Sequence, residues 1–330
     1  MTSGGPARTV LLVVHTGRPE GVQAARKVAG WLSAAGVTVR LLKSEADDLR
    51  CPDGKVVPAS PQAAQDAEMV VVIGGDGTLL RAAELARPAG TPLLGVNLGH
   101  VGFLAEAEPD VLYDAVDHLL AGRYVVERRM TVDVVIRRNG DVVATTWALN
   151  EATVEKAARE RMLDLVTEVD GRPLSRWGCD GIVFATPTGS TAYAFSAGGP
   201  VVWPDVEALL LVPISAHALF AGPMVVSPES VLAVEVIGAT GGSGEVSGAV
   251  LWCDGRRRVD LPAGARVEVR RGSLPVLLAR IAVGRGGEVA AIGASFTDRL
   301  VAKFGLPVAG WRGRGEARGR VRDEEPAGDA

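Results

Sequence analysis

A glycine-rich segment with one acidic residue lies between a buried strand and a helix in the first third of the chain. The segment is Gly74-Gly75-Asp76-Gly77-Thr78, and it follows the apolar run EMVVVI and precedes the helical run LLRAAELA. Glycine lets a backbone turn tightly and approach a ligand, and the free N–H groups that begin a helix favour phosphate oxygens. Because a carboxylate repels phosphate, Asp76 requires another task, such as accepting a proton from an attacking hydroxyl or holding Mg²⁺.

The sequence of this segment separates it from the common phosphate-binding loops. It lacks the GxxxxGK[ST] pattern, and Gly75-Asp76-Gly77 is followed by Thr-Leu-Leu rather than by the third glycine of a dinucleotide fingerprint. The simplest alternative is a tight strand-to-helix turn in which Asp76 caps the helix. Because the segment holds more glycine than a cap requires, its composition favours a ligand-binding loop.

A second polar segment follows Asp180 by a few residues. Its hydroxyl and N–H groups, beside the flat phenol ring of Tyr193, suit a ribose and a nucleotide base. The segment runs Thr186-Pro187-Thr188-Gly189-Ser190-Thr191-Ala192-Tyr193, followed by Ser196, Gly198 and Gly199. The four letters TPTG alone would also fit an idle turn, but their combination with Asp180 and the Ser/Gly run favours a nucleotide site.

A third polar pair, Asn150-Glu151, stands where the run TTWALN ends. A carboxamide beside a carboxylate can bind the two hydroxyls of a ribose. As a lone dipeptide it is more typical of a turn, and it gains weight only together with the other two segments.

The elements that must position these segments form two different patterns. In residues 1–123, strand-like runs alternate with helical spacing, which predicts a parallel sheet covered on both faces. Strands are expected at 9–15, 37–42, 68–73 and 93–96, helices at 21–35, 79–86 and 110–121, and a loop at 47–61. The fold class expected is therefore an α/β N-terminal domain that binds nucleotide.

The pattern changes near Tyr124, after which strands dominate. Asn139-Gly140, Asp170-Gly171 and Asp254-Gly255 are hairpin signals, and they favour a mainly β, sandwich-like C-terminal domain over residues 124–285. Strands are expected at 131–137, 142–150, 163–169, 182–185, 209–212, 231–236, 250–253, 267–270 and 276–281. A helix at 296–304 is expected to close the chain, with residues 286–305 packing back on the first domain. Residues 306–330 lack periodicity and predict a disordered tail.

Composition narrows the possible partners and compartment. A net charge of −4 gives no broad basic surface, which argues against nucleic-acid binding and leaves room for a local basic pocket. Three scattered cysteines without a CxxC pair, and four histidines, do not favour a zinc site and fit a reducing cytoplasm. No run of 18 apolar residues is present, so no membrane span is expected.

Taken together, these motifs resemble those of the NAD kinase family, over about residues 10–310. The matching segments are GGDGT at 74–78, LGHVGFL at 98–104, Asn150-Glu151, Asp180-Gly181, TPTGSTAY at 186–193 and SAGGP at 196–200. GGDGT is shared with diacylglycerol-type lipid kinases and, in looser form, with phosphofructokinases. TPTGSTAY after an Asn-Glu pair is much more specific to NAD kinases.

The resemblance implies a site between the two domains, with Mg²⁺, ATP as donor, NAD as acceptor, and a homodimer or homotetramer. Asp76 is expected to act as general base on the 2′-hydroxyl of the adenosine ribose, and the Mg²⁺ to be held mainly by the nucleotide phosphates. The residues implied to bind substrate or phosphate are Gly74, Gly75, Gly77, Thr78, Arg81, Asn150, Glu151, Arg161, Asp180, Thr188, Ser190, Thr191, Ala192, Tyr193, Ala194, Phe195 and Ser196.

Some positions depart from the family pattern or fit a second explanation. Arg81 and Arg161 would equally suit a solvated helix or strand face. Gly178 stands where some members carry a basic residue, two positions before the Asp, and His100 stands where many carry Arg. The sequence leaves open whether inorganic polyphosphate also serves as donor and NADH as acceptor.

Two other functions are compatible with parts of the sequence. A lipid or sphingoid-base kinase would share GGDGT, but no basic amphipathic stretch stands out for a membrane surface. A non-catalytic regulator that binds dinucleotides would keep TPTGSTAY, but it would have no need for Asp76. Phosphorylation of NAD by a small-molecule kinase therefore remains the main hypothesis.

Overall fold

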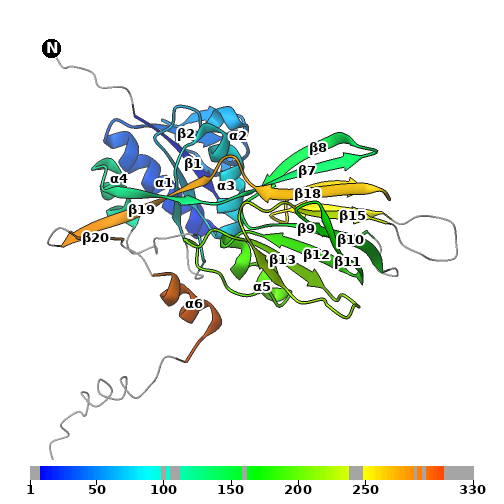
Figure 1. Cartoon of the computed structure of the whole chain (residues 1–330). Helices are drawn as coiled ribbons and strands as arrows, with labels where there is room; N and C mark the ends of the chain where they lie inside the picture. Colours follow the sequence, from blue (N-terminus) through cyan, green and yellow to red (C-terminus); the bar gives the residue numbers. More distant parts are fainter. Residues whose placement is uncertain are drawn as a thin grey trace, which may run out of the picture.

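A parallel sheet builds the first half of the molecule (Figure 1). The computed structural model describes residues 8–97, 102–104, 112–157, 162–237, 248–285, 288–291 and 295–307. The parallel strands are β1 (Thr9–Val14), β2 (Thr38–Leu42), β3 (Lys55–Val57), β4 (Met69–Ile73) and β5 (Leu93–Val96), in the order β5-β4-β1-β2-β3. The α/β fold expected for this half is confirmed.

Helices cover both faces of this sheet, and the alternation along β1 shows how. Val10, Leu12 and Val14 pack with side chains of α1 and α4, whereas Leu11 and Val13 pack with α3. Successive side chains of a strand point to opposite faces, so a strand buried on both sides has to be apolar throughout. The helices are α1 (Pro19–Ala34), α2 (Lys43–Leu49), α3 (Asp76–Ala89) and α4 (Leu112–Leu120).

The loop expected at residues 47–61 is partly wrong. Helix α2 extends to Leu49, and residues 55–57 form the edge strand β3, which pairs with β2. A three-residue strand with neighbouring proline and glycine is too short to show an alternating pattern, because its position is set by the ladder of β2 rather than by its own composition.

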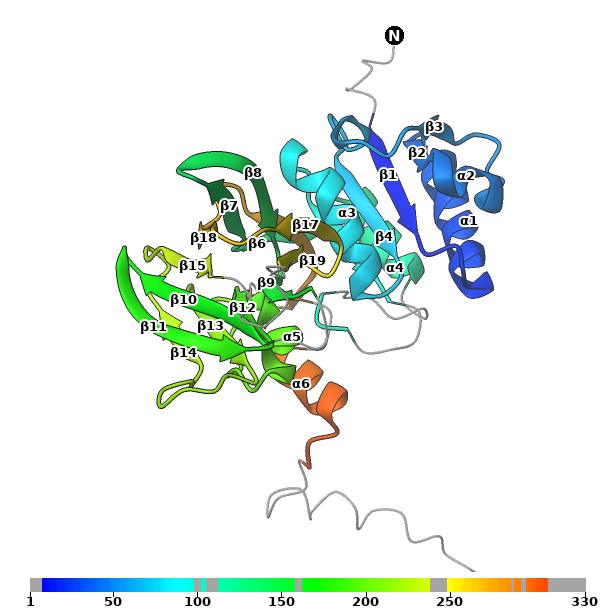
Figure 2. The ribbon, with the colours of Figure 1, turned by 90° about the vertical axis from the view of Figure 1, so that its right-hand side faces the viewer.

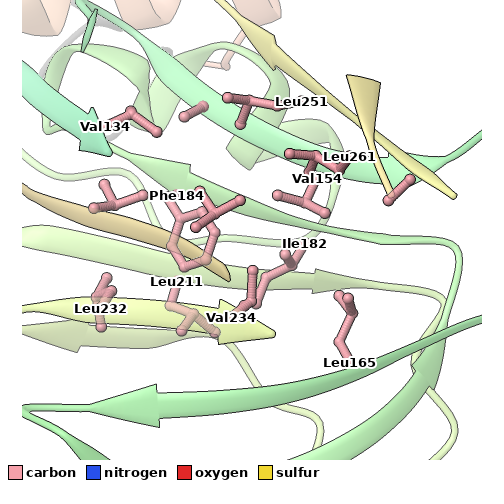
Figure 3. Close-up of a cluster of buried hydrophobic side chains, with 14 of the residues drawn as sticks. Val134, Val154, Leu165, Ile182, Phe184, Leu211, Leu232, Val234, Leu251 and Leu261 are labelled. Carbon is pink, nitrogen blue, oxygen red and sulfur yellow. The ribbon is translucent and has the colours of Figure 1, made fainter. Parts of the chain in front are cut away.

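Two six-stranded antiparallel sheets form the second half, in the orders β11-β10-β15-β18-β7-β8 and β14-β13-β12-β9-β16-β17. Their facing side chains make one apolar core around Trp177 and Phe184, part of which is drawn in Figure 3. This confirms the expected sandwich. The strands are β7 (Val132–Arg138), β8 (Asp141–Ala148), β9 (Glu151–Lys156), β10 (Leu163–Val169), β11 (Arg172–Cys179), β12 (Gly181–Ala185), β13 (Leu209–Ile214), β14 (Met224–Val226), β15 (Leu232–Val236), β16 (Ala249–Cys253), β17 (Arg257–Leu261) and β18 (Ala265–Arg271).

All three expected hairpins are present. Asn139, Asp170 and Asp254 have positive φ values of 53°, 52° and 53°, each followed by a glycine with positive φ, and they join β7 to β8, β10 to β11 and β16 to β17. Strands β11 and β17 were not expected. They lie at the edges of their sheets, where alternate side chains are exposed and the sequence is rich in arginine.

The expected strand 142–150 is shorter than predicted. Strand β8 ends at Ala148, and after Leu149 and Asn150 the chain enters β9 at Glu151. Asn150 therefore lies just before a strand rather than at the end of one. Strand β9, which was not expected, lies in the interior of its sheet between β12 and β16.

The first sheet also takes strands from beyond residue 123, so the predicted boundary between the domains is displaced. Strand β6 (Tyr124–Arg129) pairs with β19 (Val276–Arg285), and β19 pairs with β5 and with β20 (Glu288–Ala291). Hydrogen bonds of the strand ladders thus assign residues 124–129 and 276–285 to the first domain rather than the second.

The last described helix, α6 (Phe296–Phe304), has the expected bounds and contacts both domains. Its Phe296 and Phe304 rings lie 5.9 and 6.0 Å from Phe103, and Phe304 lies 4.6 Å from Phe195. The expected tail lies outside the described residues from position 308 onward. No helix in the described segments is long and apolar enough to cross a bilayer.

Candidate active site

The glycine-rich segment forms the turn between β4 and α3. Gly74 has φ +153°, and a Cβ there would lie 2.5 Å from Thr78 Oγ1, so this position requires glycine. Helix α3 begins at Asp76, three residues earlier than expected, with Gly75 as its N-cap. The exposed backbone of Gly75 and Gly77 is therefore presented at the start of a helix, where N–H groups are free for anions.

The Asp76 carboxylate is held by a separate loop. Its Oδ2 accepts the N–H of Phe103 at 3.1 Å, and its Oδ1 accepts the N–H of Leu104 at 3.2 Å. A Cβ on Gly102 would lie 2.5 Å from Oδ1, so the loop passes as close as glycine allows. The side chain is half-buried and forms no cap on its own helix, which excludes the simple capping explanation.

Asp76 and the glycine turn line a cavity of about 600 Å³ to which both domains and α6 contribute. Arg256 reaches it from the β16–β17 turn and is held by Glu84 of α3 at 3.0 Å, and Lys303 reaches it from α6. The cavity is lined by Val14, His15, Thr16, Arg18, Ser44, Glu45, Gly74, Gly75, Asp76, Gly77, Thr78, Arg81, Asn97, Gly102, Arg256 and Lys303. Its cationic side chains suit a polyanionic ligand.

Arg81 lines the same cavity, but its guanidinium is already bound by other groups of the protein. Its Nη2 lies 2.6 Å from Oε1 of the buried Glu45 and donates to the carbonyl of Val14 at 2.9 Å. Burial raises the pKa of Glu45, and the charge of Arg81 and the N–H of Val14 oppose that rise. Arg81 therefore compensates the charge of a buried carboxylate at the cavity. The alternative interpretation, in which Arg81 lies on a solvated helix face, does not fit these contacts.

Asn150 and Glu151 lie beside the TPTG segment in space, although the two segments are far apart in sequence. The N–H groups of Leu149 and Asn150 donate to Asp254, and the Asn150 carbonyl accepts the N–H of Thr186 at 2.9 Å. A Cβ on Gly189 would lie 1.9 Å from the Asn150 carbonyl oxygen, so the two backbones touch. The second and third motifs thus form one site.

The Glu151 side chain is the most perturbed group of this site. It is 8% exposed, and its Oε2 has no hydrogen-bond partner in the described part of the chain. Burial and, to a smaller degree, the charge of Asp254 raise the pKa of Glu151 to about 8, against an opposing bond from the Tyr193 N–H. A buried carboxylate with an unused oxygen is suited to accept a hydroxyl of a bound ligand.

The residues from 188 to 196 divide into two groups. Thr188, Ser190 and Ala194 are buried, and the Ser190 hydroxyl both donates to and accepts from the backbone of Val202. These positions hold the shape of the loop. The other residues of this stretch are partly or largely exposed and therefore accessible to a ligand: Thr191, Ala192, Tyr193, Phe195 and Ser196.

Asp180 does not line the cavity around Asp76. It pairs with Lys156, and this contact, more than those of Ser215 and His217, lowers the pKa of Asp180.

Two of the sequence positions singled out above, Arg161 and His100, lie outside the described residues. At Gly178 a Cβ would lie 2.6 Å from Met162 Sδ, so a larger side chain there would have to displace that methionine.

Three residues that the structure brings to these candidate sites were missed by the sequence analysis. Arg256 and Lys303 lie far from the glycine turn in sequence, and Asp254 was assigned only to a hairpin. A signal was present for Arg256, since three consecutive arginines follow Asp254-Gly255. For Lys303 on an isolated short helix there was none.

Comparison with known proteins gives a consistent result. The family models for the ATP-NAD kinase N-terminal and C-terminal domains match residues 10–124 and 149–281. NAD kinase 2 of Streptomyces avermitilis is 61% identical over 309 residues, which cover 93% of this chain and 97% of that protein. The NAD kinase of Thermobifida fusca is 59% identical over 320 residues, covering 94% and 93%.

Two solved structures are also similar. An NAD kinase from Archaeoglobus fulgidus in complex with ATP has a TM-score of 0.61 at 28% identity, covering 83% of this chain and 93% of that one. Yeast NADH kinase complexed with NADH has a TM-score of 0.79 at 21% identity over 92% and 89% of the two chains, which shows the shared fold. The chain therefore belongs to the NAD kinase family and is a phosphotransferase of that class.

Proposed function

We propose that this protein transfers the γ-phosphoryl group of ATP to the 2′-hydroxyl on the adenosine side of NAD, with Asp76 as the general base. The observation that carries the proposal is the position of Asp76, a carboxylate in a glycine turn at the wall of a cationic cavity. Phosphoryl transfer requires mainly in-line placement and compensation of charge, and the cationic side chains of the cavity support the second requirement.

The proposed reaction uses the residues of the cavity directly. Asp76 accepts the hydroxyl proton as the 2′-oxygen bonds to the γ-phosphorus, and the bond from that phosphorus to the bridging oxygen breaks to release ADP. The N–H groups at the start of α3, together with Arg256 and Lys303, compensate the charge on the donor phosphates. On the acceptor side, Asn150 and Glu151 bind ribose hydroxyls, and Tyr193 contacts a base.

A divalent cation such as Mg²⁺ fits this site only with help from the substrate. In the described residues no three His, Cys, Asp or Glu side chains lie close enough to form a protein cage. Asp76 and the donor phosphates together would supply oxygen ligands of the kind that Mg²⁺ prefers. When bound, the ion would neutralise charge on the transferred group.

The decisive experiment is a coupled assay of NADP formation by the purified protein. NAD and NADH are supplied in turn as acceptor, and ATP and inorganic polyphosphate in turn as donor, with diacylglycerol as a competing acceptor. We expect phosphorylation of NAD and none of diacylglycerol. Lipid phosphorylation would contradict the proposal, and so would tight NAD binding without turnover, which a non-catalytic regulator would give.

The donor end of the cavity gives a second prediction. Arg256→Ala and Lys303→Ala are each expected to raise the KM for ATP about 10-fold, because each removes a charged contact to phosphate worth roughly 1.5 kcal/mol or more. The KM for NAD should change little. Initial rates at varied ATP measure both constants.

The matched control for these variants is Arg258→Ala. Arg258 lies two residues further along, in β17, where it pairs with Asp260 and lies over the Trp252 ring, and it does not line the cavity. Its ATP KM should equal that of the parent. If all three substitutions raise the KM for ATP to the same extent, the cause is the loss of positive charge on the protein as a whole rather than the loss of a contact to the donor.

Assembly and location extend the proposal. We propose a homodimer or homotetramer, supported by large apolar side chains exposed within residues 203–226: Trp203, Val206, Leu219, Phe220 and Val225. Light scattering after size exclusion tests it, and a monomer at assay concentrations would contradict it. The unpaired Cys51, Cys179 and Cys253 are consistent with the cytoplasm as its location.

A further inference from the structure

A buried arginine of α6 is connected to Asp76 through a single peptide group. Arg299 is 5% exposed, and its Nη1 donates to the carbonyl oxygen of Phe103 at 2.7 Å. Burying a guanidinium is costly unless its donors meet acceptors, and the Phe103 carbonyl is one such acceptor. The contact joins positions 196 residues apart in sequence.

The same peptide group faces Asp76 on its other side. The Phe103 carbonyl and the Leu104 N–H belong to one planar trans peptide, so they point in opposite directions. The Leu104 N–H donates to Asp76 Oδ1 at 3.2 Å, while Arg299 holds the carbonyl. A cation at one end and a carboxylate at the other orient the peptide dipole and strengthen both hydrogen bonds.

We propose that Arg299 is a positioning residue for Asp76, which it orients by holding the peptide between Phe103 and Leu104. This inference rests on the proposed function of Asp76 as general base. Without Arg299 the peptide is free to rotate and to turn its carbonyl oxygen toward the carboxylate. Repulsion between the two oxygens would then move Asp76 out of line with the acceptor hydroxyl.

The docking of α6 keeps Arg299 in place. The rings of Phe296 and Phe304, on the same helix, both pack against Phe103, at 5.9 and 6.0 Å from its ring. Figure 2 shows α6 beside α5, the helix of Phe195, whose ring lies 4.6 Å from Phe304. The helix thus connects the carboxylate in the first domain with the nucleotide loop of the second.

The test compares two substitutions of similar length. Arg299→Met keeps most of the buried stem but removes the charge and the donors, and we expect kcat to fall about 10²-fold because small misplacements of reacting groups are costly. The KM values for NAD and ATP should stay within about 3-fold, since the binding residues are untouched. Arg299→Lys retains one charged donor and should recover a large part of kcat.

A double-variant comparison shows whether Arg299 acts through Asp76. In an Asp76→Asn background, the further change Arg299→Met is expected to lower the residual rate little, because the carboxylate that it positions is already gone. Asp298→Ala is the matched control. It removes the capping box of α6 without touching the Phe103 contact, and kcat should remain near that of the parent.

The outcomes separate the two proposals. Parental kcat in Arg299→Met, with activity lost in Asp76→Asn, overturns the positioning role and leaves the proposed function intact. Parental kcat in Asp76→Asn overturns the general base itself. Fully multiplicative losses in the double variant, or a loss in Asp298→Ala as large as in Arg299→Met, also overturn the inference. If Arg299→Met fails to fold, the kcat and KM values of Arg299→Lys decide.

Discussion

Asp76→Asn is expected to lower kcat by about 10²–10⁴-fold, the range that a positioned general base contributes. Asparagine has nearly the same shape, and its carbonyl oxygen can still accept one of the two N–H groups from Phe103 and Leu104. It cannot take the proton of an attacking hydroxyl. NAD binding should persist, because the residues proposed to bind NAD lie on other elements.

Three measurements test this expectation together. Turnover comes from the NADP-formation assay, NAD affinity from calorimetry, and folding from a thermal melt. Asp117→Asn, at an exposed ion pair of α4, is the matched control for an Asp-to-Asn change and should retain full activity. Near-normal turnover in Asp76→Asn would remove the general base from the mechanism, whatever the control shows.

The glycine turn that carries Asp76 was predictable because local residue types dictate it. A strand, a glycine turn and a helix follow one another in the sequence, and the turn needs glycine at Gly74, where φ is +153°. The hairpins at Asn139, Asp170 and Asp254 were predictable for the same reason, since their backbone favours Asn or Asp followed by Gly. Steric requirements between neighbouring residues can therefore be recognised in a single sequence.

What could not be predicted depends on contacts between distant segments. Strand β19 joins the first sheet because its ladder with β5 and β6 is available there, and nothing in its own alternation distinguishes that sheet from the other two. Likewise Lys303 reaches the cavity, and Arg299 reaches the Phe103 carbonyl, only because α6 docks on Phe103. An arginine on a short helix has the same local signature whether it is solvated or buried.

The unexpected edge strands have a related cause. Strand β17 begins with arginines, and Arg257 lies 4.4 Å from the centre of the Trp147 ring, which Arg87 of α3 also contacts at 4.4 Å. Charged residues in a strand look unfavourable until such partners are known. The composition of β17 therefore reflects its interface with α3 rather than its preference for a loop.

Glu151→Gln is expected to stabilise the ligand-free protein in alkaline solution and to have little effect in acid. The folded-state pKa of Glu151, raised to about 8 by burial first and then by Asp254, lies above its ordinary value of 4.5. The folded protein therefore keeps a proton that the unfolded chain releases, and stability falls as the pH rises from about 4.5 to about 8. Glutamine resembles the protonated form and removes this loss.

The size of the effect follows from the shift. Each pKa unit corresponds to about 1.4 kcal/mol, so a pKa raised from 4.5 to about 8 lets the variant exceed the parent by up to roughly 5 kcal/mol at pH 9 and by almost nothing near pH 4.5. Urea unfolding of both proteins at a series of pH values measures the difference. Glu155→Gln, two residues along β9 and half-buried, is the matched control for a Glu-to-Gln change on the same strand.

Binding of NAD should depend on pH in the opposite direction. A ribose hydroxyl that donates to Glu151 Oε2, the oxygen without a partner, favours the ionised carboxylate. NAD should therefore bind the parent more tightly at pH 9 than at pH 7, with a proton released on binding, whereas the affinity of Glu151→Gln should be weaker and flat over that range. Calorimetry in buffers of different ionisation enthalpy counts the proton. If NAD binding releases none and the two proteins share one pH profile, Glu151 accepts no hydroxyl from the coenzyme.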